Sequence, residues 1–309
     1  MDHDPYRRHR SWESDTGQQP QEKEAMPPRS SPTARQIRLG TQLRKMREAA
    51  GVSSREAGAL LGGGQPQISH IEAGRFGISE ERLRRLAAFY SADDTALIDA
   101  LAAITHEQRG QGWWESYRGI LPAPLLDLSE LEHHATRLRT IQITHIPGLL
   151  QTDAYARTIF GSTMPPLPET ELEARVSHRM ERQKIFARDE VPPYEAVVHE
   201  AALRMRFGGR KVAREQLETL LGLSEEPHIG LRVIPFESEA HIGSGHAMLY
   251  AHGPVPQLDT VQVDAAHGIG FLDTEPHLRK YRSLYDTMRA SALSESRSRA
   301  FIQTIVREM

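Results

Sequence analysis

The fold of the N-terminal part is decided by residues 53–74, which read SSREAGALLGGGQPQISHIEAG. Ser53, followed three residues later by Glu56, is a capping box, in which the two residues satisfy each other's backbone N–H groups at a helix start. The helix that it opens ends at the glycines 62–64, and a second, short helix is expected over residues 65–73. Two helices joined by a short glycine turn predict a helix-turn-helix.

Helical periodicity surrounds this unit. Leu39, Leu43, Met46 and Ala50 recur at the spacing of one helix face, so a helix precedes it. Two more helices are expected after it, the first capped by Ser79 and the second spanning about residues 93–106. Residues 34–107 therefore predict an all-α domain of five helices.

The second helix of such a unit lies in the major groove of DNA and presents its N-terminal residues to base edges. Glutamine amides can pair bidentately with adenine, and residues at the ends of the two helices can contact phosphates. The candidate DNA-contacting residues are Ser54, Arg55, Gln65, Gln67, Ser69, His70 and Arg75. A helical hairpin whose glutamines are merely solvated has the same spacing, and spacing alone leaves that alternative open.

The charge of the chain is unevenly distributed. The 309 residues carry a formal net charge of −3, which by itself argues against a partner such as nucleic acid. Residues 37–90, however, contain nine basic and five acidic residues, a net charge of +4 that leaves −7 for the rest. A basic N-terminal domain joined to an acidic remainder suits a protein that must bind DNA at particular sites without extensive non-specific binding.

Composition excludes several classes of protein. The chain has no cysteine, so disulfides, thiolate metal sites and cysteine nucleophiles are ruled out. It has neither an apolar stretch of the ~20 residues that a membrane span needs nor a secretory signal, so we expect a cytoplasmic protein that does not bind membranes. Residues 1–33 contain no Val, Ile, Leu or Phe and predict a disordered tail.

The remaining residues, 112–309, alternate between strand-like and helix-like patterns and predict a larger α+β domain. Strands are expected at 140–144, 194–198, 229–235, 248–251 and 260–263, and helices at 128–136, 152–160, 169–188, 209–223, 275–290 and 294–307. On the long helix, the charged run of Arg179, Glu181, Arg182 and Lys184 is interpreted as a solvated face.

No catalytic motif in this domain is complete. His199-Glu200 begins like a zinc-protease motif, but Leu203 stands where the second histidine is needed. The pairs Gly243-x-Gly245 and Gly268-x-Gly270 lack the third glycine of a dinucleotide fingerprint, and we interpret these glycines as turns. We therefore expect no enzyme activity, no cofactor and no metal site.

Aromatic residues cluster near the start of the α+β domain. Trp113, Trp114 and Tyr117, with Tyr155, have the composition of a small-molecule or partner pocket at a domain junction. The same residues would serve equally as an apolar contact that fastens the two domains together. Both interpretations stay open at the level of the sequence.

Residues 52–62 and 65–74 resemble the xenobiotic-response-element, or Cro/C1-type, family of helix-turn-helix regulators. The resemblance implies that Gln65, Gln67 and His70 reach bases and that Ser54 contacts a phosphate. Three glycines depart from the family pattern, namely Gly58, Gly63 and Gly64. A glycine inside a helix costs ~1 kcal/mol, so the domain is expected to be less stable than its relatives unless DNA or a second copy steadies it.

The rest of the chain resembles the large C-terminal domain of unknown function found in antitoxin-like regulators of actinobacteria. The sequence motifs that carry this resemblance lie at residues 112–114, 146–152, 155–157, 200–204 and 233–236. It implies a homodimeric transcriptional regulator of the repressor type that binds double-stranded DNA through helix 65–73. Regulation by a small ligand or by a partner protein encoded nearby would act through the sensor and dimerisation domain, 112–309. The alternative is an antitoxin-like interaction protein whose main role is to bind that partner.

Overall fold

The protein is described by a computed structural model that covers residues 32–107, 111–239, 247–265 and 268–309. Residues 1–31 of the expected tail lie outside these ranges, as do Gly243 and Gly245. In the described part, the structure confirms a helical N-terminal region followed by an α+β domain.

The N-terminal region consists of five helices, as the sequence predicts. They are α1 (Ala34–Ala49), α2 (Ser54–Leu60), α3 (Gln65–Glu72), α4 (Glu80–Phe89) and α5 (Thr95–Thr105). One apolar core holds them together, with Leu43, Leu83 and Leu101 at its centre, each with at most 1% of its surface exposed. A second capping box, between Thr33 and Gln36, starts α1.

A six-stranded sheet organises the C-terminal domain, in the order β3-β2-β1-β4-β5-β6. The strands are β1 (Arg137–Gln142), β2 (Tyr194–His199), β3 (Ile229–Ile234), β4 (Met248–His252), β5 (Thr260–Ala265) and β6 (Gly268–Leu272). The first three strands run parallel to one another, and β4, β5 and β6 add antiparallel pairs. The sheet is therefore mixed.

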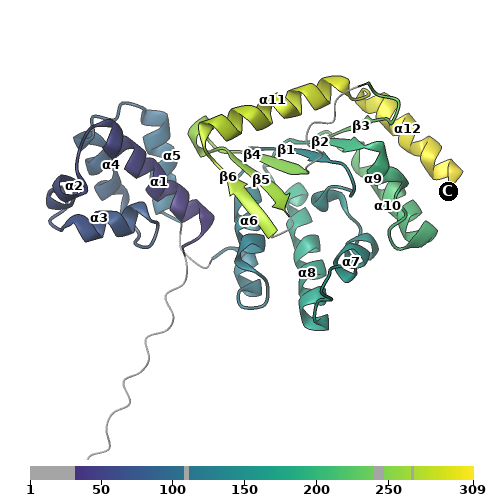
Figure 1. The fold of residues 1–309 in the computed structure, drawn as a ribbon, viewed down its shortest axis with the longest axis horizontal. Coiled ribbons are helices and arrows are strands. Elements are labelled where there is room, and N and C mark those ends of the chain that lie inside the picture. The colour runs from purple at the N-terminus through teal and green to yellow at the C-terminus, as the bar shows by residue number, and fades with distance from the viewer. Residues whose placement is uncertain (1–31, 108–110, 240–246, 266–267) are drawn as a thin grey trace, which may run out of the picture. The chain divides into compact units, whose positions relative to one another are not determined.

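Helices cover both faces of this sheet (Figure 1). They are α6 (Ala123–His133), α7 (Asp153–Gly161), α8 (Glu169–Arg182), α9 (Glu200–Arg204), α10 (Gly209–Leu223), α11 (Glu275–Ser291) and α12 (Glu295–Glu308). On one face, α11 packs through Tyr285 and Met288 against a core that includes Val197 of β2. The neighbouring residues on that strand, Ala196 and Val198, point into the larger core on the other face. Strand β2 is thus buried on both faces, as central parallel strands are.

Two strands differ from the sequence prediction. Strand β1 begins at Arg137, three residues before the predicted start, because Arg139 pairs across the sheet with Glu195 at 3.3 Å and covers the Tyr285 ring at 5.0 Å. The interpretation of Gly268 and Gly270 as turn residues is wrong, since both lie in the edge strand β6. Glycines hide a strand from pattern analysis because they show neither apolar alternation nor β propensity.

Two helices also differ in extent. Helix α6 begins at Ala123, earlier than predicted, with Pro124 in its first turn where proline is tolerated. The helix predicted over 169–188 is α-helical only to Arg182 and continues as the short 3₁₀ helix η3 (Gln183–Ala187).

The first helix also contacts the α+β domain, within the single unit formed by residues 32–309. Arg38 is buried and donates hydrogen bonds to the backbone carbonyls of Gln257, Asp259 and Asp273. Leu258, from the same segment, packs into the apolar core of the five helices. Residues distant in sequence therefore tie α1 to the sheet domain.

Among the helices of the described residues, none is both long and apolar enough to cross a membrane.

Candidate functional sites

The helix-turn-helix is formed by α2 and α3 and depends on the predicted capping box. Ser53 Oγ accepts from the Glu56 N–H, and the Glu56 carboxylate accepts from the Ser53 N–H at 2.8 Å. Gly64 caps α3 without a side-chain hydrogen bond, in extended backbone. Ile68 and Ile71 bury one side of α3, which leaves the opposite side for a partner.

Most of the predicted DNA-contacting side chains are exposed. Gln65 and Ser69 are exposed on α3 itself, and Arg55 and Arg75 are exposed at the two ends of the unit. Ser54 is half-buried at the start of α2. Helix α3 thus carries exposed polar side chains, and exposed arginines precede it in α2 and follow it in the chain.

The other two predicted residues, Gln67 and His70, are half-buried. The Gln67 amide lies against Gly63, so close that a Cβ there would overlap its oxygen, and that oxygen has no hydrogen-bond partner. The His70 ring lies against the exposed ring of Phe76 in a tilted arrangement, with 4.7 Å between ring centroids. Phe76 was missed at the level of the sequence because a single phenylalanine after a turn glycine shows no pattern.

A charged pair holds the far end of α3. The Arg47 guanidinium on α1 donates to both carboxylate oxygens of Glu72, at 2.6 and 3.0 Å, and also to the Val52 carbonyl at 2.9 Å. The two side chains keep only 10% and 9% of their surface exposed. The orientation of α3 therefore depends on α1 as well as on the turn.

Gly58, one of the departures from the family pattern, lies where α2 meets the turn. A Cβ at Gly58 would lie 2.6 Å from the carbonyl carbon of Gly64 and 2.7 Å from its oxygen. These are backbone atoms and cannot move aside without displacing the start of α3. The glycine is therefore required by the close approach of two backbones.

Replacing Gly58 by alanine is expected to lower the free energy of unfolding by about 1–2 kcal/mol, because overpacking outweighs alanine's better helix propensity. Urea denaturation measures this. Gly222→Ala is the matched control, since a Cβ there meets nothing within 4 Å, and it is expected to be neutral or slightly stabilising. A Gly58→Ala variant as stable as the unmodified protein would contradict the close packing.

The predicted aromatic residues do not come together in one place. Trp113 and Trp114 meet edge to face at 5.8 Å and line a cavity of about 270 Å³ with Arg35, Glu107 and other residues. Tyr117 packs beside them, and its hydroxyl lies 2.8 Å from that of Ser177. Tyr155 lies apart, in the main core, where its hydroxyl accepts from a backbone N–H.

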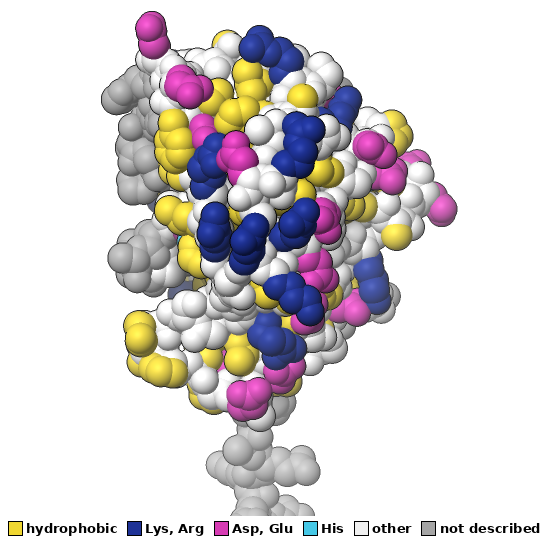
Figure 2. Space-filling model, turned by 90° about the vertical axis from the view of Figure 1, so that its right-hand side faces the viewer, with side chains coloured by type: hydrophobic (Ala, Val, Ile, Leu, Met, Phe, Trp, Pro, Cys, Tyr) yellow, Lys and Arg dark blue, Asp and Glu magenta, His cyan; other side chains and the backbone are white. Residues whose placement is uncertain are grey.

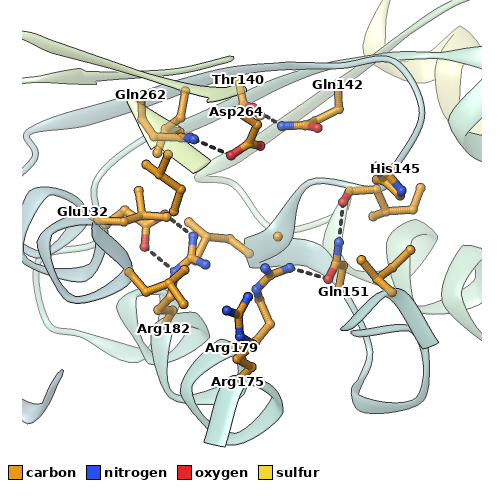
Figure 3. Close-up of a pocket in the computed structure, with 18 of the residues that line it drawn as sticks. Glu132, Thr140, Gln142, His145, Gln151, Arg175, Arg179, Arg182, Gln262 and Asp264 are labelled. Carbon is orange, nitrogen blue, oxygen red and sulfur yellow. Dashed lines mark hydrogen bonds and ion pairs between the residues drawn. The ribbon is translucent and has the colours of Figure 1, made fainter. Parts of the chain in front are cut away.

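A second cavity, of about 350 Å³, lies between α8 and the sheet. Figure 3 shows its two sides: Arg175, Arg179 and Arg182 of α8 on one, and polar residues of the sheet on the other. The sheet residues are Thr140, Gln142, Gln262 and Asp264. The sequence interpretation of α8 as a solvated charged face is wrong for Arg182, which is buried, and for Arg179, which faces this cavity. Lys184 is exposed, as expected, and Glu181 is half-buried.

The arginines of the cavity differ in how their charge is compensated. Arg182 makes two hydrogen bonds, of 2.8 and 2.6 Å, with the buried carboxylate of Glu132 on α6. Arg175 pairs with Glu171 at 2.7 Å. Arg179 has no ion pair with an acidic group of the described residues, and its guanidinium donates to the Gln151 side chain instead. The spacing 175, 179, 182 is a helical stripe, and this was the available signal in the sequence.

In the described part of the chain, no three histidine or acidic side chains come together as a metal site would require. His178, the buried histidine nearest the arginine stripe, bonds to the Ser129 hydroxyl at 2.8 Å. Burial, with the charges of Arg182 and Arg179, lowers the pKa of His178 to about 3, so it is neutral at physiological pH.

Comparison with known proteins assigns both parts of the chain. Residues 38–101 match a family described as Helix-turn-helix domain, and residues 125–304 match one described as Domain of unknown function (DUF5753). No curated protein and no solved structure matches the chain. The second match spans more than half of the sequence. The chain therefore belongs to the DUF5753 family and carries an XRE-type helix-turn-helix ahead of that domain.

Proposed function

We propose that the protein is a sequence-specific transcriptional regulator that reads operator half-sites with α3. The observation that carries this proposal is the exposed polar face of α3, with Gln65 and Ser69 outward and Arg55 and Arg75 at its borders. Arginines at the ends of the unit suit phosphate contacts, which fix register, and the amide suits base readout. The net charge of +4 over residues 37–90 favours approach to DNA.

We further propose that the protein acts as a homodimer. One helix-turn-helix contacts too few base pairs to specify a single site in a genome. Dimers of such domains bind half-sites about 34 Å apart. The C-terminal domain would supply the dimer contact and the regulatory input. The buried Arg38, which ties α1 to the segment around Leu258, supports such a connection between the two domains.

Gln65→Ala is expected to weaken specific binding by about 1–3 kcal/mol, roughly 5- to 150-fold, because one bidentate base contact is lost. Gel shifts at fixed salt measure this on fragments recovered by genome-wide binding of the tagged protein. Gln303→Ala, which removes an exposed glutamine of α12, is the matched control and is expected to bind normally.

Binding to unrelated DNA distinguishes the loss of base contacts from a loss of electrostatic attraction to phosphates. The Gln65→Ala variant should keep the non-specific affinity and salt dependence of the unmodified protein, since these come from phosphate contacts. A Gln65→Ala variant that binds the operator as tightly as the unmodified protein would exclude α3 as the reading helix.

A second candidate function is the binding of a small acidic partner protein. Figure 2 shows that Lys and Arg side chains gather on the face of the C-terminal domain where α10 and α12 are found. Exposed cations near α9 and the start of α10 include Arg206 and Lys211. Met205, 39% exposed, precedes Arg206 in the chain, and Phe236, 58% exposed, contacts the start of α9. Arginine with Met and aromatic residues is the composition of protein interfaces.

Affinity purification of the tagged chain followed by mass spectrometry tests this candidate. An acidic protein that is recovered with the unmodified chain, and lost from a Phe236→Ala variant that still binds DNA, would support it. Equal recovery with both chains would place the partner elsewhere.

A further inference from the structure

The cavity between α8 and the sheet contains a cation that has no ion-pair partner among the described residues. Of the three arginines that α8 contributes, Arg182 is balanced by Glu132 and Arg175 by Glu171. Arg179 has no carboxylate within ion-pair distance among residues 32–107, 111–239, 247–265 and 268–309. Glu132 and Asp264 act on it only from further away. One positive charge is therefore left over at the cavity wall.

The surroundings of Arg179 hold its guanidinium in place without satisfying it. One terminal nitrogen donates to the Gln151 side chain, and the guanidinium lies 4.8 Å from the centre of the Phe160 ring. Its Nε–H is buried and has no hydrogen-bond partner within the part of the chain that the structure describes. Gly148 allows this approach, since a Cβ there would lie 3.1 Å from the guanidinium. An arginine that is held in place and has unused N–H donors commonly binds a carboxylate or phosphate through two parallel hydrogen bonds.

The charged form of Arg179 is disfavoured by its surroundings. Burial, together with the positive charge of Arg182, lowers the pKa of Arg179 to about 9. A charge taken out of water without a counterion is destabilising, so a fold keeps one mainly where something else supplies the opposite charge. Within the described residues, no carboxylate lies close enough to form an ion pair with Arg179, and Asp264 of the same cavity acts on it only from a distance.

The opposite wall offers complementary groups. Asp264 accepts a hydrogen bond from Gln262 at 2.8 Å, and the amide of Gln142 donates to Thr140 at 3.2 Å (Figure 3). These carboxylate and amide oxygens can accept hydrogen bonds from hydroxyl or amino groups. A cavity of about 350 Å³ is near the lower limit of small-molecule sites, which suits a metabolite rather than a large ligand.

We propose that this cavity binds a small polar metabolite whose carboxylate or phosphate group pairs with Arg179 and whose hydroxyl or amino groups face Asp264 and Gln142. The anion provides the counterion that Arg179 lacks and uses its free donors.

Binding at this cavity would also reach the DNA-reading domain. Helix α6 lines the cavity through Leu128 and Glu132, and its Asp127 accepts a hydrogen bond at 3.2 Å from the N–H of Ala34, the first residue of α1. A displacement of α6 by a ligand would therefore be felt at the start of α1. This regulatory step rests on the proposed function, whereas the binding of the anion does not.

The test uses the full chain and two simple anions. Its melting temperature is measured in potassium phosphate, in potassium acetate and in potassium chloride at equal pH and ionic strength. At least one of the first two is expected to raise it by about 2–4 °C over chloride, the shift for an anion at about five times its dissociation constant. A response to phosphate alone indicates a phosphorylated ligand, and a response to acetate indicates a carboxylic acid. No response to either overturns the proposal.

Variants of Arg179 connect the response to this residue. Arg179→Met should melt at the same temperature as the unmodified protein or higher in chloride, and should lose the anion response. Arg157→Met, which removes an exposed arginine of α7, should keep it. If Arg179→Met does not fold, Arg179→Lys keeps the charge but not the planar fork, and its anion shift should fall by at least half. A retained full shift in either variant contradicts the proposal.

Gel shifts with the same proteins keep the two hypotheses apart. An intact anion shift in a chain that binds no DNA counts against the proposed function alone. Normal DNA binding without any anion shift counts against this inference alone.

Discussion

Glu132→Gln is expected to lower the free energy of unfolding by about 3–5 kcal/mol, the largest effect predicted for a single substitution in this protein. Glutamine keeps the shape of the side chain but removes the charge that balances Arg182. Both partners are almost fully buried, with 6% of Arg182 and 4% of Glu132 exposed. The variant would leave two uncompensated arginines, Arg179 and Arg182, beside one cavity.

Urea denaturation of the purified protein measures the loss. The matched control is Glu173→Gln, which removes the partner of Arg157 in an exposed pair and is expected to change stability little. Phosphate or acetate should recover part of the loss in Glu132→Gln if an anion can enter the cavity. A Glu132→Gln variant as stable as the control would show that the ion pair does not determine the packing of α6 on α8.

Arg47→Ala is expected to cost about 2–4 kcal/mol in the stability of the helix-turn-helix domain and to abolish specific DNA binding. Glu72 would be left without its partner between α1 and α3. The expected loss of stability is slightly smaller than for a deeply buried ion pair. The Arg47–Glu72 pair, although covered by side chains, lies near the surface of a small domain. The loss of binding follows because the end of α3 would no longer be held.

Circular dichroism on heating and gel shifts at fixed salt together check this prediction. Arg44→Ala is the control, since Arg44 pairs with Glu48 on the exposed side of the same helix. It removes an equal charge, so a general electrostatic effect on DNA affinity would appear in both variants. If Arg47→Ala unfolds at the same temperature as Arg44→Ala, the pair with Glu72 does not support α3.

The two parts of the chain differ in how far the sequence predicts them. The five helices were predictable because their signals are local: Ser53 and Glu56 form a capping box within one turn, and the core positions repeat at helical spacing. Strand β6 was not predictable, because Gly268 and Gly270 join the sheet only through pairing with β5. Strand β1 was misplaced because the charge of Arg139 is neutralised by a residue on another strand, Glu195.

The same distinction applies to the candidate sites. The sequence by itself determined the helix-turn-helix and the outward face of α3, since helix periodicity decides which side chains are buried. It also showed Gly58 as unusual, without the reason, which is the backbone of Gly64 lying against it.

The surroundings of the arginines on α8, by contrast, depend on the three-dimensional fold. Their spacing places them on one face of a helix without showing whether that face is solvated, and it is the packing of α8 under the sheet and beside α6 that buries Arg182 and points Arg179 into a cavity. Whether a charge has a partner depends on residues distant in the chain, such as Glu132 for Arg182. Local pattern therefore predicted the helix-turn-helix, and long-range packing decided how the charges around the cavity are compensated, because compensation of charge is a property of three-dimensional neighbours.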